Sequence, residues 1–166
     1  LPLPHIFCHN SPMRRILATI CLTLAVLLGS AGCSNNLQKG YAAYHSGDYA
    51  TALREWTPLA EQGNASAQSN LGWMYANGQG VTQDDKTAVK WYRLAAKQGD
   101  AGAQSNLGAM YNTGRGVPKD FKTAVKWYRL AAEQGIAPAQ SNLGLMYLEG
   151  RVVPQNYKTA MKWYRL

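Results

Sequence analysis

The sequence predicts an all-α fold, a superhelical solenoid of stacked helical hairpins. Two motifs recur with a constant step of 36 residues: Ala-Gln-Ser-Asn-Leu-Gly starts at positions 67, 103 and 139, and Lys-Thr-Ala-x-Lys-Trp-Tyr-Arg-Leu starts at positions 86, 122 and 158. Within each unit, apolar residues recur at the spacing of one helix face. A single hairpin cannot bury its tryptophan and tyrosine side chains alone, so neighbouring units must stack and share a core.

The first residues predict export. We interpret residues 1–12, which lack helical or strand periodicity, as an extension upstream of a true start at Met13. The alternative is that they are a genuine part of a longer N-terminal region of the signal peptide. Residues 13–32 follow the order of a signal peptide: two arginines, then 13 residues that are apolar except for two threonines, then small residues. As a helix the apolar run spans only about 20 Å, too short for about 30 Å of bilayer hydrocarbon.

The segment Ala31-Gly32-Cys33 resembles the lipobox of bacterial lipoproteins, in which the cysteine is linked to diacylglycerol. The resemblance implies a membrane anchor at Cys33, a linker over residues 33–36 and, because Ser34 follows, sorting to the periplasmic face of the outer membrane. Ser30 departs from the usual leucine, and the alternative is a freely secreted protein cut nearby. No cysteine follows Cys33, so the repeats offer no thiol for a disulfide or a metal.

A shorter unit over residues 37–66 is predicted to cap the array. Its Gly40, Gly47-Asp48-Tyr49, Ala52 and Trp56 resemble the ordinary tetratricopeptide pattern. The segment Leu59-Ala60-Glu61-Gln62-Gly63 then matches the ends of the later second helices.

The unit over residues 67–102 is predicted to form two helices, each with one apolar stripe. The stripe of the first helix consists of Ala67, Leu71, Met74 and Tyr75. Gly72 lies among them, where a missing side chain lets a neighbouring helix approach. The stripe of the second helix consists of Ala88, Trp91, Tyr92 and Ala95.

Polar residues and glycines mark the ends of these helices. Asn77-Gly78-Gln79-Gly80 ends the first helix with residues that tolerate positive φ. Asp84 lies near the start of the second helix, where the positive end of the helix dipole stabilises a carboxylate. Asp120 and Asn156 occupy the same position in the next two units, and Pro118 suits a first helical turn.

The same two helices are predicted in residues 103–138 and, in part, in residues 139–166. The chain stops at Leu166, before the Ala-Ala-x-Gln-Gly end of the last second helix, and Val152 replaces a loop glycine. We expect a truncated sequence here, the alternative being a partner that covers the open end.

The combined pattern Ala-x-x-x-Leu-Gly-x-x-Tyr, Gly-x-Gly-Val, Asp-x-x-x-Ala and Trp-Tyr-x-x-Ala-Ala-x-Gln-Gly resembles the Sel-one-like repeat, a longer-loop relative of the tetratricopeptide repeat. The resemblance implies a tetratricopeptide-like superhelix that acts as a non-enzymatic scaffold or adaptor. It further implies a protein or peptide partner and no cofactor.

By the same resemblance, positions on the first helices face a concave groove. Some of these positions carry different residues in different units. We expect these residues, and their counterparts in the capping unit, to bind the partner: Tyr41, Tyr44, His45, Trp73, Asn77, Ala109, Asn112, Thr113, Leu145, Leu148 and Glu149. The groove is then most aromatic at its N-terminal end, which suits capture of a peptide. The alternative is that Trp73 or Tyr41 packs against a neighbouring helix.

Basic residues outnumber acidic ones, 17 to 9, and several recur on the second helices. Stacking is expected to align them as a basic ladder: Lys90, Arg93, Lys97, Lys126, Arg129, Lys162 and Arg165. The ladder is either a surface for anionic lipid headgroups or an acidic partner, or an ordinary solvated face. Nucleic acid is not an expected partner, because the signal peptide exports the protein away from it.

The chemical motifs are weak, and we predict no catalytic residue and no metal site. Gly78-x-Gly80 lacks the strand that a phosphate-binding loop requires. His45 is the only histidine after the signal and has no recognisable triad around it. Thr87-x-x-Lys90 resembles the Ser-x-x-Lys of penicillin-binding enzymes only faintly. The alternative function is an envelope hydrolase acting on β-lactam or peptidoglycan substrates, an activity described for some cysteine-rich relatives whose paired cysteines this chain lacks.

Overall fold

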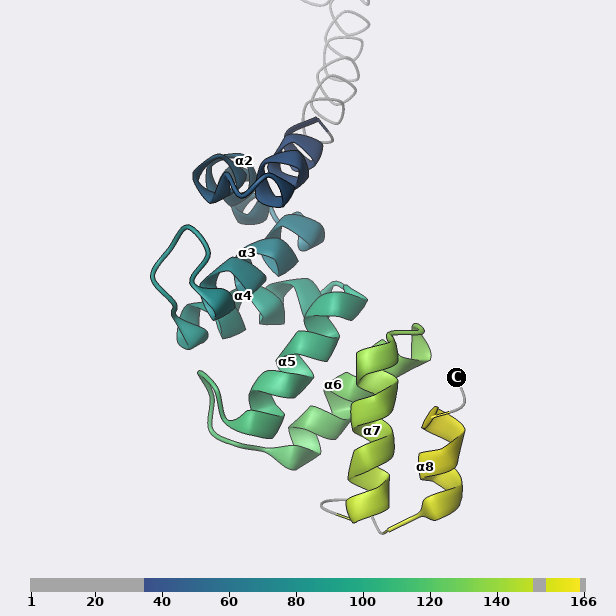
Figure 1. Ribbon diagram of the computed structural model, residues 1–166. Helices are drawn as coiled ribbons and strands as arrows, with labels where there is room; N and C mark the ends of the chain where they lie inside the picture. Colours follow the sequence, from purple (N-terminus) through teal and green to yellow (C-terminus); the bar gives the residue numbers. More distant parts are fainter. Residues whose placement is uncertain (1–34, 151–154, 165–166) are drawn as a thin grey trace, which may run out of the picture.

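The computed structural model describes residues 35–150 and 155–164, and every regular element within them is a helix (Figure 1). A helical segment over residues 35–45 comes first. It is followed by α2 (Tyr49–Glu61), α3 (Ala65–Asn77), α4 (Asp85–Lys97), α5 (Ala101–Thr113), α6 (Phe121–Glu133), α7 (Ala137–Glu149) and α8 (Tyr157–Tyr164). The predicted signal peptide, Cys33 and Arg165 lie outside the described residues. None of the helices described is long and apolar enough to cross a membrane.

The helices pair into antiparallel hairpins, α3 with α4, α5 with α6 and α7 with α8, and each hairpin stacks on the next (Figure 1). This confirms the predicted all-α solenoid. The first helices, α3, α5 and α7, also contact one another along the array, more closely than the second helices do among the described residues. The first helices therefore form the inner layer of the curve.

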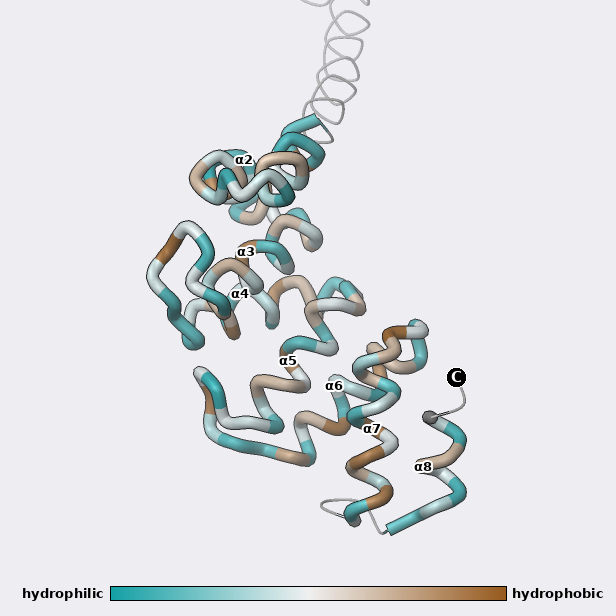
Figure 2. The backbone as a smooth tube through the Cα atoms, viewed as in Figure 1, coloured by the Kyte–Doolittle hydropathy of each residue, from teal (hydrophilic) through white to brown (hydrophobic). Residues whose placement is uncertain are grey.

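The buried stripes lie where the sequence predicts them. Ala67, Leu71 and Met74 of α3 are buried, as are Ala88 and Tyr92 of α4. Hydrophilic and hydrophobic residues alternate along each helix, as amphipathic packing requires (Figure 2). Three apolar clusters result, each shared between neighbouring units.

Glycines on the first helices allow the aromatic residues of the second helices to approach closely, as predicted. A Cβ atom built on Gly72 would lie 2.6 Å from Cδ1 of Tyr92, and one on Gly108 would lie 2.8 Å from Cδ1 of Tyr128. In the capping unit, Gly40 faces the indole of Trp56 in the same way. The small residue and the large ring are thus paired in the capping unit and in the α3–α4 and α5–α6 hairpins.

The helix ends also follow the sequence, with one exception. Gly78 and Gly114 close α3 and α5 with φ of 66° and 79°, and Asp84 and Asp120 are the N-caps of α4 and α6. Pro118 is the exception: it lies in the loop two residues before the Asp120 cap, not in the first turn of α6, because the capping carboxylate fixes where the helix begins.

The first helices begin two residues before the predicted unit boundaries at 67 and 103. They start at Ala65 and Ala101 because the side chains of Asn64 and Asp100 accept hydrogen bonds from the amides of Ala67 and Ala103.

Candidate functional site

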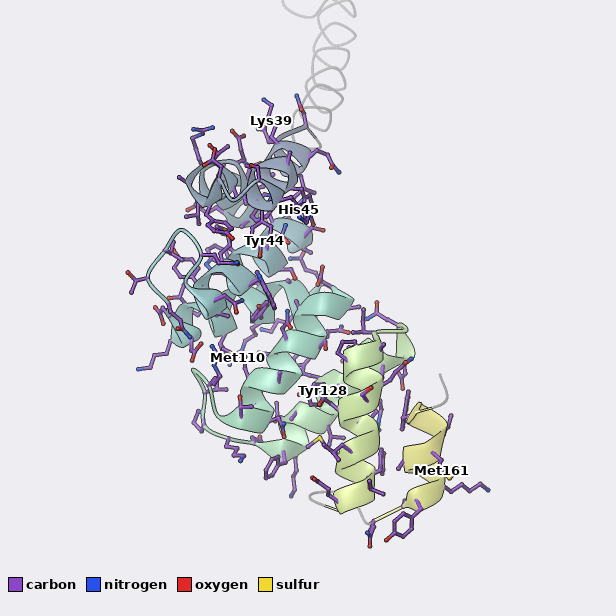
Figure 3. The ribbon with its side chains drawn as sticks, viewed as in Figure 1. Lys39, Tyr44, His45, Met110, Tyr128 and Met161 are labelled. Carbon is purple, nitrogen blue, oxygen red and sulfur yellow. The ribbon has the colours of Figure 1, made fainter. Side chains whose placement is uncertain are left out.

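The described residues form an open pocket of about 260 Å³ between the capping unit and α3. We call it the aromatic pocket. Figure 3 shows Tyr44 and His45 side by side where the first helical segment approaches α3. The pocket is lined by three residues of that segment, one of α2 and two of α3: Tyr41, Tyr44, His45, Trp56, Asn70 and Trp73.

Trp56 holds the inner wall of the aromatic pocket in place. Its indole is 1% exposed, and Nε1 donates a hydrogen bond to the carbonyl oxygen of Leu37 at 3.2 Å. The Tyr41 ring meets it edge-on with a centroid separation of 5.3 Å, and the Tyr44 ring lies 5.7 Å away. Edge and tilted contacts of this kind stabilise aromatic clusters beyond the burial of their area, so this wall is rigid.

A chain of hydrogen bonds orients the outer wall. Nε1 of Trp73 donates to the hydroxyl of Tyr44 at 2.7 Å, and that hydroxyl donates to Oε1 of Gln79 at 2.8 Å. Trp73 is nevertheless 44% exposed. Its indole is therefore fixed in direction while its ring stays open to solvent, which is the arrangement of an aromatic anchor for a ligand.

Asn70 contributes a polar group without a partner. Its side-chain nitrogen is buried and makes no hydrogen bond within the described part of the chain. Leaving a buried donor unsatisfied costs about 1–3 kcal/mol. That nitrogen has almost no solvent-accessible surface, so a ligand in the pocket would contact the rest of the Asn70 side chain, and the mostly aromatic lining favours an apolar group.

The aromatic pocket gathers four of the predicted partner-binding residues: Tyr41, Tyr44, His45 and Trp73. The prediction missed Trp56 and Asn70. Asn70 could not be found by comparing the units, because the same asparagine occurs in all three. Trp56 was recognised only as a structural position of the capping unit.

The other predicted partner-binding residues lie outside the pocket. Asn77 donates from Nδ2 to the carbonyl oxygen of Trp73 at 2.8 Å, and the Thr113 hydroxyl donates to that of Ala109 at 2.8 Å. Ala109 is not an open groove position, since it packs half-buried against the cluster between α6 and α7. The rest are half-buried or exposed on α5 and α7: Asn112, Leu145, Leu148 and Glu149.

The predicted basic ladder divides into two kinds of residue. Arg93 and Arg129 each donate from Nη2 to a tyrosine of the following first helix at 2.9 Å, to Tyr111 and Tyr147. The lysines of the ladder are exposed: Lys90, Lys97, Lys126 and Lys162. The arginines thus connect units, and the lysines face solvent.

No feature of the described residues favours the hydrolase alternative. The His45 ring meets the Tyr44 ring edge-on with a centroid separation of 5.7 Å. Over residues 35–150 and 155–164, no three His, Cys, Asp or Glu side chains gather as metal ligands would. Gly78 and Gly114 end helices, which confirms that they are connecting-loop glycines.

Comparison with known proteins gives the same repeat boundaries as the helices. The model of the Sel1 repeat family matches residues 65–100, 101–136 and 137–166. A search of curated proteins found no match.

The solved structures that are similar to this chain include three repeat proteins. A Sel1 repeat protein from Oxalobacter formigenes is 41% identical with a TM-score of 0.73, over 77% of this chain and 53% of its own length. The c5321 protein, a protective antigen of uropathogenic Escherichia coli with an SLR fold, is 40% identical with a TM-score of 0.76, over 87% of this chain and 32% of its own.

Cysteine rich protein B of Helicobacter pylori is 26% identical with a TM-score of 0.56, over 71% of this chain and 91% of its own length. The chain therefore spans about half of the Oxalobacter formigenes protein and about a third of the Escherichia coli protein.

Proposed function

Because this chain belongs to the Sel1 repeat family, we propose that it is a non-enzymatic scaffold that binds a peptide segment of a protein partner at the aromatic pocket. Proteins of this family are generally protein-interaction scaffolds and generally lack enzymatic activity. The observation that carries the proposal is the exposed ring of Trp73, which its hydrogen bond to the Tyr44 hydroxyl holds in a fixed direction at the aromatic pocket.

The size and lining of the pocket favour a peptide over a free small molecule. Small-molecule sites usually enclose about 300–1,000 Å³, and this cavity of about 260 Å³ suits one large side chain. An aromatic or aliphatic side chain would pack between Tyr41 and Trp73.

The scaffold is proposed to act at the bacterial envelope, attached through Cys33 to the periplasmic face of the outer membrane. Support for this comes from the sequence of residues 13–34 alone. Incorporation of a labelled fatty acid into the wild-type chain, and its loss in Cys33→Ala, is the expected result. Equal labelling of the two chains would contradict the anchor.

The peptide proposal is tested by selecting a displayed random peptide library on the full chain. We expect enriched peptides to share a large apolar residue, and their affinity to fall at least tenfold in Trp73→Ala and in Asn70→Ala. Tyr157→Ala is the matched control, because Tyr157 is 61% exposed on α8, at the other end of the array. Peptides that bind all three variants as tightly as wild type would place the binding surface elsewhere.

A further inference from the structure

The second helices carry a line of lysines on the side that faces away from the core. On α4 this line consists of Lys86, Lys90, Leu94 and Lys97, spaced at i, i+4, i+8 and i+11, which keeps them on one helix face. All four are exposed. The buried residues Ala88 and Tyr92 lie on the opposite side of the same helix. The line therefore points outward from the solenoid.

The repeat places equivalent residues on α6 and α8. Together the exposed residues form what we call the lysine face: Lys86, Lys90, Leu94 and Lys97 of α4, Lys122, Lys126, Leu130 and Glu133 of α6, and Lys158 and Lys162 of α8. Its two leucines are 46% and 44% exposed. The face thus combines many positive charges with apolar side chains that are open to solvent.

The lysine face holds the whole excess positive charge of the mature chain. It carries seven lysines and one glutamate, whereas the eight basic and eight acidic residues elsewhere after Cys33 balance one another. The ion pairs found in the described residues join Arg54 to Glu55 and Arg115 to Asp85, and neither involves a lysine of the face. Positive charge is therefore concentrated on this face, and no lysine of the face forms an ion pair within the part of the chain that the structure describes.

We propose that the lysine face docks on the surface of an anionic lipid bilayer. A bilayer offers negative charge spread over an area, which matches exposed lysines distributed over three helices. The exposed Leu94 and Leu130 would enter the boundary between headgroups and acyl chains, as the apolar residues of interfacial helices do. The face lies on the outer layer, so docking leaves the aromatic pocket on the capping unit and α3 open to a partner.

The test compares two full-length variants of equal net charge. In the first, one lysine of the face is removed from each helix: Lys90→Ala, Lys126→Ala and Lys162→Ala. In the control, three basic residues outside the face are removed: Lys39→Ala, Arg54→Ala and Lys119→Ala. All six positions are exposed. Both variants keep residues 1–34, so any binding through that segment is common to them.

Binding is measured by flotation with vesicles of phosphatidylcholine and phosphatidylglycerol, and with vesicles of phosphatidylcholine alone. Each lysine near an anionic surface contributes about a fivefold factor in partitioning. We expect the face variant to lose roughly 100-fold in partitioning to the anionic vesicles. The control should retain most of the wild-type value. The difference in partitioning between the face variant and the control should shrink as the salt concentration rises and the Debye length falls below about 10 Å.

Equal partitioning of the two variants at every salt concentration would overturn the proposal. A further arm measures binding to polyglutamate. If the face variant loses polyglutamate binding alone and keeps vesicle binding, the lysine face is a docking surface for acidic protein, and the bilayer proposal is wrong. Circular dichroism of both variants establishes that each remains folded.

Discussion

The guanidinium of Arg93 donates a hydrogen bond to the hydroxyl of Tyr111 at 2.9 Å, and so joins the second helix of one unit to the first helix of the next. Arg129 and Tyr147 repeat this contact one unit later. At the preceding interface, Thr57 stands where the arginine would be and Tyr75 where the tyrosine is. The contact is thus a feature of the full repeats and not of the capping unit.

Removing the Tyr111 hydroxyl should weaken the array without disturbing its core. We expect Tyr111→Phe to lower the free energy of unfolding by about 0.5–1.5 kcal/mol, the range of an ordinary hydrogen bond, because the lost contact with Arg93 is only part-buried. Tyr75→Phe is the matched control and should change stability less. Urea unfolding measures both, and equal changes would mean that the arginine contact contributes nothing.

The close approach of Gly72 to Tyr92 predicts that an added methyl group is costly. Alanine normally stabilises a helix by up to about 1 kcal/mol relative to glycine. At position 72 the new Cβ would meet the Tyr92 ring at 2.6 Å, so we expect Gly72→Ala to destabilise the protein by about 1–3 kcal/mol.

The control for this substitution is Gly102→Ala. There the nearest atom to an added Cβ is Oδ1 of Asp100 at 3.4 Å, an ordinary contact. We expect no loss of stability and a gain of up to about 1 kcal/mol. Thermal unfolding that shows the same sign for both variants would contradict the packing role of Gly72.

Burial of tyrosines predicts a loss of stability at alkaline pH. Burial raises the pKa of Tyr128 to about 12 and raises the pKa of Tyr92 as well, from an ordinary value of 10.0. The unfolded chain therefore releases these protons near pH 10 while the folded chain retains them. Stability should be unaffected by these groups below pH 10 and should fall as the pH rises above it.

Urea unfolding between neutral pH and pH 11 measures this decline. Tyr128→Phe should reduce its slope, because the titrating group is gone. Tyr157→Phe removes an exposed tyrosine and should leave the slope as it is. If the stability of Tyr128→Phe falls as steeply with rising pH as that of wild type, burial of the Tyr128 hydroxyl is not the cause of the alkaline loss of stability.

The Asp120 cap predicts a loss of stability in acid. The Thr123 hydroxyl donates to Oδ2 of Asp120 at 2.6 Å and its amide to Oδ1 at 3.1 Å, and these bonds hold the pKa of the carboxyl below 3.8. The cap is therefore intact above about pH 4 and is lost as the pH falls through the lowered pKa of the folded state.

At neutral pH we expect Asp120→Ala to lower the midpoint of thermal unfolding by about 2–4 °C. The difference from wild type should shrink in acid, where the protonated carboxyl keeps only a neutral acceptor. Asp120→Asn keeps an acceptor that does not titrate, as Asn156 does naturally in the next unit, where Oδ1 accepts from the Thr159 amide at 2.9 Å. A difference that persists unchanged down to pH 2 would rule out a role for the carboxylate charge.

The unpartnered Asn70 predicts a conflict between stability and binding. Replacing it with alanine removes a buried donor that has no acceptor among the described residues. We expect Asn70→Ala to raise the free energy of unfolding by about 1 kcal/mol while weakening peptide binding. Asn106→Ala, at the equivalent position of the next unit, should gain only the helix propensity of alanine. Equal gains in the free energy of unfolding at both sites would show that the unpaired Asn70 nitrogen does not destabilise the fold.

Much of this architecture could be predicted from single residues of the repeat. The partnership of Gly72 with a neighbouring helix, the cap at Asp84 and the helix end at Gly78 all follow from local rules. Each depends on backbone conformation or on contacts within one hairpin, so a 36-residue unit contains all the information required.

The repeat itself, the hairpins and the amphipathic stripes were thus determined by the sequence. The aromatic pocket depends on tertiary structure, because two residues of α3 line it together with three residues of the first helical segment. Trp73, for example, donates a hydrogen bond to Tyr44, which lies 29 positions earlier in the chain. The capping unit has a connection of three residues, 46–48, where the next unit has seven, 78–84. The pocket therefore forms where the capping unit meets α3, and contacts between units, not the pattern within one, decide which side chains line it.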